Sequence, residues 1–113
     1  PFTIYSPIVK TEDARDFSFR LHINTLAGSG SDTLDVTIEE SDEEDFANAY
    51  RARTLLSFTQ VLGNSTSAAL LKQAIDNPLN NVNRYIRAKV AITGTVAIFS
   101  QKVVCEYLLN ERV

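Results

Sequence analysis

Residues 17–26 read FSFRLHINTL, and this stretch decides the fold class. Phe17, Phe19, Leu21 and Ile23 alternate with polar or charged residues. Successive side chains of a strand point to opposite faces of the sheet, so a period of two gives one packed face and one face in water. The stretch therefore predicts a half-buried β-strand.

The residues that follow predict a turn and a second strand. The segment 28–32, GSGSD, combines small polar residues with glycines, which adopt positive φ readily. Leu34, Val36 and Ile38 then alternate with polar residues in the same way. We therefore expect 17–38 to form a β-hairpin.

The rest of the chain supplies further strands separated by loops. Residues 55–62, 84–92 and 96–109 are rich in β-branched and aromatic side chains and predict strands. Residues 68–76 fit a helix or a strand, and strand is favoured because the neighbouring segments are strands. The acidic residues 39–45 and the segment 46–53 lack strand alternation, which predicts a long loop that can hold a helical turn.

The last predicted strand, 96–109, is partly apolar on both of its faces. Such a pattern is typical of a central strand, or of a strand whose outer face meets another protein. Together the strands predict an all-β fold with little helix, namely a single antiparallel β-sandwich of the jelly-roll or immunoglobulin-like kind.

A length of 113 residues fits one domain. We assign residues 17–113 to the sandwich domain. Residues 1–16 contain Pro7 among apolar residues and predict an N-terminal arm or an edge strand.

Composition limits the classes of function. The net charge of −3 argues against binding to duplex nucleic acid, which requires clustered positive charge. Cys105 is the single cysteine, so neither an intrachain disulfide nor a cysteine-rich zinc site is available. The sequence has no signal-peptide pattern and no apolar run as long as a membrane span, and we expect synthesis in a reducing cytoplasm without membrane association.

The residue types that carry catalysis are scarce. His22 is the single histidine, it lies on the polar side of its strand, and Cys105 lies far from it in sequence. Nucleophilic catalysis needs a base next to the nucleophile, so we predict no enzymatic activity and interpret Cys105 as a core residue. The acidic run 39–45 predicts a solvated loop, with a calcium site as the alternative. We assign no catalytic residue, cofactor or metal.

A small basic patch lies in the predicted strand 84–92. Arg84, Arg87 and Lys89 surround Tyr85, a combination that occurs in platforms for single-stranded nucleic acid. One aromatic ring and three charges are few for that purpose. Electrostatic pairing with the acidic run of the same or another copy is favoured instead.

Four short motifs occur in an order that resembles a family of virion proteins. They are VTIEESD at 36–42, FTQ at 58–60, RYIRAKV at 84–90 and TGT at 93–95. In this order they are similar to motifs of small structural proteins of tailed-phage virions, over about residues 17–109. The family's turn after the first motif is a short Asp-Gly type, whereas this chain has no glycine between Thr33 and Leu62.

The resemblance implies a non-enzymatic structural subunit of a virion assembled in the host cytoplasm. It implies a capsid decoration or cement protein, or alternatively a neck or tail protein, that contacts the major capsid protein or other virion proteins. A homo-oligomer is expected, with a trimer as one form. The candidate contact residues are Phe2, Ile4, Ile8, Val9, Arg87 and Lys89.

The second interpretation is a carbohydrate- or ligand-binding β-sandwich module, calcium-dependent in one version. Such modules usually present aromatic platforms. This chain has no tryptophan and four tyrosines, which makes that interpretation the weaker one.

Overall fold

The computed structural model describes residues 2–11, 14–46, 52–64, 72–77, 85–94 and 98–109, and every regular element in these ranges is a β-strand. The all-β prediction is confirmed. The strands are β1 (Phe2–Tyr5), β2 (Val9–Lys10), β3 (Ala14–Ala27), β4 (Thr33–Ser41), β5 (Arg53–Ser57), β6 (Val61–Leu62), β7 (Lys72–Asn77), β8 (Tyr85–Thr93) and β9 (Ile98–Leu109).

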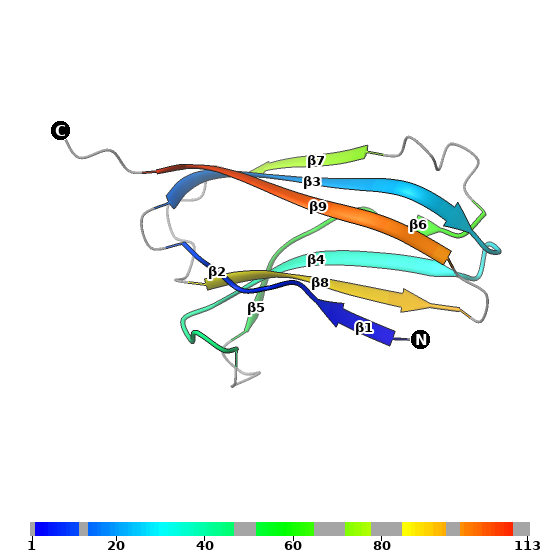
Figure 1. Ribbon diagram of the computed structural model, residues 1–113, viewed down its shortest axis with the longest axis horizontal. Helices are drawn as coiled ribbons and strands as arrows, with labels where there is room; N and C mark the ends of the chain where they lie inside the picture. The colour runs from blue at the N-terminus through cyan, green and yellow to red at the C-terminus, as the bar shows by residue number, and fades with distance from the viewer. Residues whose placement is uncertain are drawn as a thin grey trace.

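These strands form two antiparallel sheets, which Figure 1 shows as two layers. The larger sheet has six strands in the order β1-β8-β4-β5, with β2 also pairing with β8 and β6 with β4. The smaller sheet has three strands in the order β7-β3-β9. Long strands far apart in sequence are therefore neighbours.

The apolar rows of the two sheets share one core. Phe17, Phe19, Leu21 and Ile23 of β3 belong to the same buried cluster as the apolar rows of β4 and β8. Along β4 and β8, buried and half-buried residues alternate over most of the strand, as a period of two requires. Burial of these rows is the main favourable term for the fold. The finer assignment to a β-sandwich of the jelly-roll or immunoglobulin-like kind stays a prediction.

The predicted hairpin over 17–38 is wrong. β3 pairs with β7 and β9, whereas β4 pairs with β5, β6 and β8, so the loop between them carries the chain from one sheet to the other. Each strand turns its apolar row toward the shared core. An alternating pattern indicates which face is buried but does not indicate which strand is the neighbour.

Buried Asp32 organises this crossing loop. Its Oδ2 accepts a hydrogen bond from the Ser29 N–H at 2.7 Å, and its own N–H donates to the Ser29 carbonyl at 3.1 Å. Its carbonyl accepts from the Gly63 N–H at 2.8 Å, which links the loop to the end of β6. Gly94, at the end of β8, lies against the Asp32 carboxylate with a φ of +136°. Asp32 therefore lies where three chain segments meet, and it contacts them through both its carboxylate and its backbone.

The predicted strand over 55–62 is divided into β5 and β6. Between them Phe58 is buried, and its N–H donates to the Val36 carbonyl at 3.0 Å. The Gln60 amide donates to both carboxylate oxygens of Asp35 at 3.1 Å. The local bend lets Phe58 enter the core while the chain keeps following the edge of β4.

Two further strand predictions have different outcomes. The strand preference over 68–76 is confirmed for the part that β7 covers, while 68–71 lie outside the described residues. Of the two alternatives for the last strand, the central position is wrong, because the central strand of the β7-β3-β9 sheet is β3 and β9 stands at its end. The alternative, that the outer face of β9 meets another protein, stays a prediction.

Candidate interaction surface

The N-terminal residues form two short edge strands on β8. In β1, Ile4 pairs with Val90 and Tyr5 with Lys89, and in β2, Val9 pairs with Ile86. Of the two alternatives for residues 1–16, the structure has edge strands, and β3 begins at Ala14, before the predicted boundary. The start of the chain is therefore tied to the six-stranded sheet.

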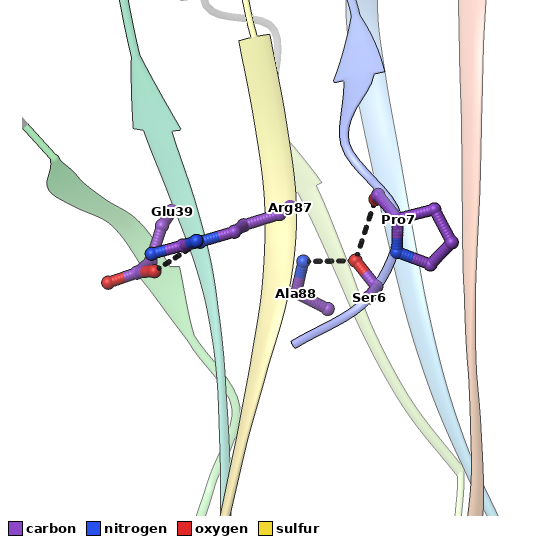
Figure 2. Close-up of polar contacts among 5 residues, drawn as sticks. All are labelled: Ser6, Pro7, Glu39, Arg87 and Ala88. Atoms are coloured by element: carbon purple, nitrogen blue, oxygen red, sulfur yellow. Dashed lines mark hydrogen bonds and ion pairs between the residues drawn. The ribbon is translucent and has the colours of Figure 1, made fainter. Parts of the chain in front are cut away.

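Ser6 and Pro7 bridge the gap between these two strands (Figure 2). The Ser6 N–H donates to the Ala88 carbonyl at 2.9 Å, and the Ala88 N–H donates to Ser6 Oγ at 2.7 Å. Pro7 has no N–H and cannot continue a ladder. The serine hydroxyl therefore takes the place of the backbone carbonyl that a continuous strand would offer to Ala88.

Three of the predicted contact residues of the arm are exposed. Ile4 is 49% exposed, Ile8 38% and Val9 40%. Ile4 lies across from buried Val90, on the core side of the sheet, but its place at the sheet edge leaves it uncovered. Phe2 is described only through its backbone pairing with Ile92.

A hollow of about 240 Å³ opens beside this arm. Its walls are mainly apolar side chains of both sheets and the Ser6–Pro7 link. The lining residues are Ser6, Pro7, Val9, Phe19, Ile38, Ile86, Arg87 and Ala88. The hollow therefore connects Val9 of the arm with the core residues Phe19 and Ile38.

Arg87 joins three distant segments on the outer side of β8. It is the direct cross-strand partner of Glu39, and its Nε donates to Glu39 Oε1 at 2.9 Å (Figure 2). Its Cζ lies 4.0 Å from the centre of the Tyr5 ring and 4.1 Å from the centre of the Phe46 ring. The side chains of Arg87 and Glu39 are only 17% and 13% exposed, so solvent screens this pair weakly.

Phe46 completes the cluster from an unusual backbone conformation. Its φ is +54°, in the left-handed region that non-glycine residues seldom adopt. The preceding turn is held by the Ser41 hydroxyl, which accepts from the Glu43 N–H at 3.1 Å. The ring is buried against Arg87, and this burial offsets the cost of the backbone conformation, which is on the order of 1 kcal/mol.

The predicted electrostatic pairing between the basic patch and the acidic run is confirmed for Arg87 and Glu39 of the same copy. The guanidinium of Arg87 is thus engaged within its own chain. Lys89 is half-buried between the positions of Tyr5 and Thr37, and Arg84 lies outside the described residues. A contact role for Arg87 and Lys89 with another protein stays a prediction.

The acidic run is partly strand, which corrects the prediction of a loop over 39–45. Glu39 and Glu40 belong to β4, and buried Glu40 lies 3.4 Å from the guanidinium of Arg53. Asp42, Glu44 and Asp45 are exposed. Within the described part of the chain, no three His, Cys, Asp or Glu residues are grouped to hold a metal ion.

His22 and Cys105 occupy different rungs of the β3–β9 ladder. Cys105 pairs with Phe19, whereas His22 pairs with Lys102, three rungs away. His22 is half-buried and Phe19 is buried, as expected for positions on opposite faces of one strand. The register therefore does not bring the histidine to the cysteine.

Sequence reasoning did not identify Tyr5, Ser6 and Phe46 as parts of this surface. Tyr5 and Arg87 each alternate with apolar residues, which places them on the polar face of their strands. Their contact with one another depends on the register of β1 against β8. Nothing at position 46 indicates a left-handed residue, because the residue is a phenylalanine and not a glycine or an asparagine.

Replacement of Arg87 by alanine is expected to lower the free energy of unfolding by about 2 kcal/mol. The carboxylate of Glu39 would lose its hydrogen-bonded cation, and the rings of Tyr5 and Phe46 would lose their cation–π contacts. Arg87→Lys should recover only part of this loss, since an ammonium lacks the planar stacking surface. Urea denaturation followed by circular dichroism measures both. The control is Glu44→Ala, which removes an exposed charge and should change stability by less than about 0.5 kcal/mol. Equal losses for the two alanine variants would contradict the role of the Arg87 cluster.

The described residues form no helix of the length and apolar character needed to cross a membrane. No known protein family, curated protein or solved structure matches the chain.

Proposed function

We propose that this chain is a non-enzymatic structural subunit of a virion, most specifically a capsid decoration or cement protein. The observation that carries the proposal is the exposed apolar arm, formed by Ile4 of β1, Val9 of β2 and Ile8 in the link between them. Apolar residues grouped at one edge are characteristic of a protein–protein contact. The partner is the major capsid protein or another virion protein.

The arm is held in a defined position before any partner binds. Ser6 ties it to Ala88, and Tyr5 packs on Arg87, which Glu39 orients. A contact segment that is already ordered loses less conformational freedom on binding than a flexible one. This supports an arm that binds neighbouring subunits as a rigid edge.

The mechanism follows from mass action. A subunit that binds the assembled shell and not its dissociated parts stabilises the shell. Many copies on a symmetric lattice make individually weak contacts effective together. The same surface serves a neck or tail position, which differs only in the identity of the neighbouring protein.

A ligand-binding module is the second candidate, and the hollow beside the arm is the observation that favours it. Its volume of about 240 Å³ is below the range of about 300–1,000 Å³ that is usual for small-molecule sites. Its apolar lining suits an aliphatic or aromatic group better than a sugar. We therefore place this function second, and its carbohydrate-specific version lower still.

The test is co-sedimentation of the purified chain with capsid shells of the virus that encodes it. The double variant Ile4→Ser/Ile8→Ser is expected to bind at least about tenfold more weakly, because two exposed apolar contacts are lost. Leu62→Ser is the matched control, since Leu62 is 39% exposed but lies on β6, away from the arm. Binding by Leu62→Ser should equal that of the unmodified chain. A chain that never sediments with the shells overturns the proposal.

A further inference from the structure

Among the described strands, β9 is a long edge strand of the smaller sheet. It has 12 residues, and β3 is its one partner among the described strands. Between Gln101 and Glu106 its pairing with β3 has no register shift, so this stretch is a regular strand. A regular edge offers a row of backbone donors and acceptors to another strand.

The edges of the larger sheet are less suited to strand addition. On one side, β1 and β2 are short and separated by residues 6–8, which include Pro7. On the other side, β5 has five residues and a register shift against β4 between Ile38 and Glu39. Proline, short strands and bulges are three of the features that block edge-to-edge pairing, and charged side chains are a fourth unless an opposite charge stands across from them. Within 101–106, β9 has no proline and no bulge against β3, and its two charges, Lys102 and Glu106, are opposite in sign.

The sequence of β9 is complementary to itself in the antiparallel direction. When two copies are paired about a two-fold axis at Val104, Lys102 of each copy stands across from Glu106 of the other. In the same register Val103 stands across from Cys105, and Val104 across from itself. A shift of the axis to Cys105 would instead put Lys102 across from Leu108 and Glu106 across from Val104. Opposite charges directly across from one another favour the first register.

We propose that two copies of this chain associate through β9, antiparallel and centred on Val104, and thereby join two three-stranded sheets into one continuous sheet. The contact is isologous, so each copy supplies the same surface and the pair closes on itself. The inference stands apart from the proposed virion role, because it uses a different sheet from the arm.

β7 is the competing edge of the same sheet. Its Lys72 and Asp76 have the same spacing as Lys102 and Glu106, so β7 could also pair with itself about Ala74. β7 has six residues, half the length of β9, and offers fewer backbone hydrogen bonds. The longer strand is therefore the expected contact, and the β7 contact is an outcome that the experiment separates.

The experiment is sedimentation velocity on charge-reversed variants. Lys102→Glu and Glu106→Lys should each weaken the dimer roughly tenfold or more, because both symmetry-related charge pairs become repulsive. An equimolar mixture of the two variants should recover dimers, since every pair across the interface is then opposite in charge. The matched control is Lys72→Glu, which should leave the dimer unchanged. Loss of the dimer in Lys72→Glu but not in Lys102→Glu would assign the contact to β7 and overturn the proposal.

A second measurement covers variants that fold poorly. In the double variant Val104→Cys/Cys105→Ala, the two thiols face one another at the two-fold axis and should form an intermolecular disulfide on mild oxidation. In Ser100→Cys/Cys105→Ala the new thiol stands across from Leu108 and should not cross-link. A strictly monomeric unmodified chain, or equal cross-linking of both variants, overturns the β9 interface. Neither result bears on binding to capsid shells.

Discussion

Replacement of Gly94 by alanine is expected to lower the free energy of unfolding by about 3 kcal/mol or more. The φ of +136° at Gly94 is disfavoured for any residue with a Cβ, and such a conformation costs about 1–3 kcal/mol. The new methyl group would also overlap the carboxylate of Asp32, which is 1% exposed and cannot move into solvent. Thermal and urea denaturation followed by circular dichroism measure the loss.

Gly30→Ala is the matched control, in the loop that Asp32 organises. A Cβ at Gly30 would lie 3.1 Å from Nδ2 of Asn64, an exposed side chain that is able to rotate away. We expect a change within about 0.5 kcal/mol. The Gly94→Ala substitution is then made in an Asp32→Ala background. Compared with Asp32→Ala alone, Gly94→Ala should there cost only the part of the free energy that comes from φ, because the overlap with the carboxylate is gone. Similar losses for Gly94→Ala and Gly30→Ala would show that the contact with Asp32 is unimportant.

Replacement of Phe19 by alanine is expected to cost about 3–5 kcal/mol, the range for removing a buried phenylalanine ring. Phe19 is 1% exposed and belongs to the core cluster that both sheets share. It also lines the hollow, so the cavity that exists there would grow. Because the chain has no tryptophan, tyrosine fluorescence or circular dichroism must follow the unfolding transition.

The double variant Phe19→Ala/Ile38→Ala tests whether the two sheets pack as one unit. Phe19 lies on β3 and Ile38 on β4, and both line the same hollow. Their effects should deviate from additivity by about 0.5 kcal/mol or more, as residues in one packed cluster do. The control Leu62→Ala, at a 39% exposed position, should change stability by less than about 1 kcal/mol. Additive losses, or two separate unfolding transitions, would contradict a shared core.

The alternation of residues was enough to predict the strands β3, β4 and β8 and the buried face of each. The rows that begin at Phe17, Leu34 and Ile86 are buried as expected. The pairing of these strands was not predictable, because the same pattern fits a hairpin and a crossing between sheets. The GSGSD segment has turn composition in either case, and only the position of Asp32 among three chain segments distinguishes them.

The contacts of Arg87 were also not predictable from the sequence, although its outward-facing position was. Charge and alternation indicated that Arg87 faces outward and that an acidic partner was available. The partner is Glu39 because β4 and β8 pair in one particular register, and that register depends on the whole sheet. The bend at Phe58 and the left-handed Phe46 also follow from burial of one ring each, which local propensity does not reveal.

The antiparallel pairing of distant strands has a consequence for biosynthesis. Phe2 pairs with Ile92 and Ala14 with Leu109, which are separations of 90 and 95 residues. At about 5–20 residues per second of translation, β1 waits roughly 5–20 seconds for its partner. A nascent chain that has not yet released β8 lacks the strand that connects β1 to β4, so neither layer is complete. β1 is thus synthesised well before the strand it pairs with, and the six-stranded sheet is completed only after β8 has left the ribosome.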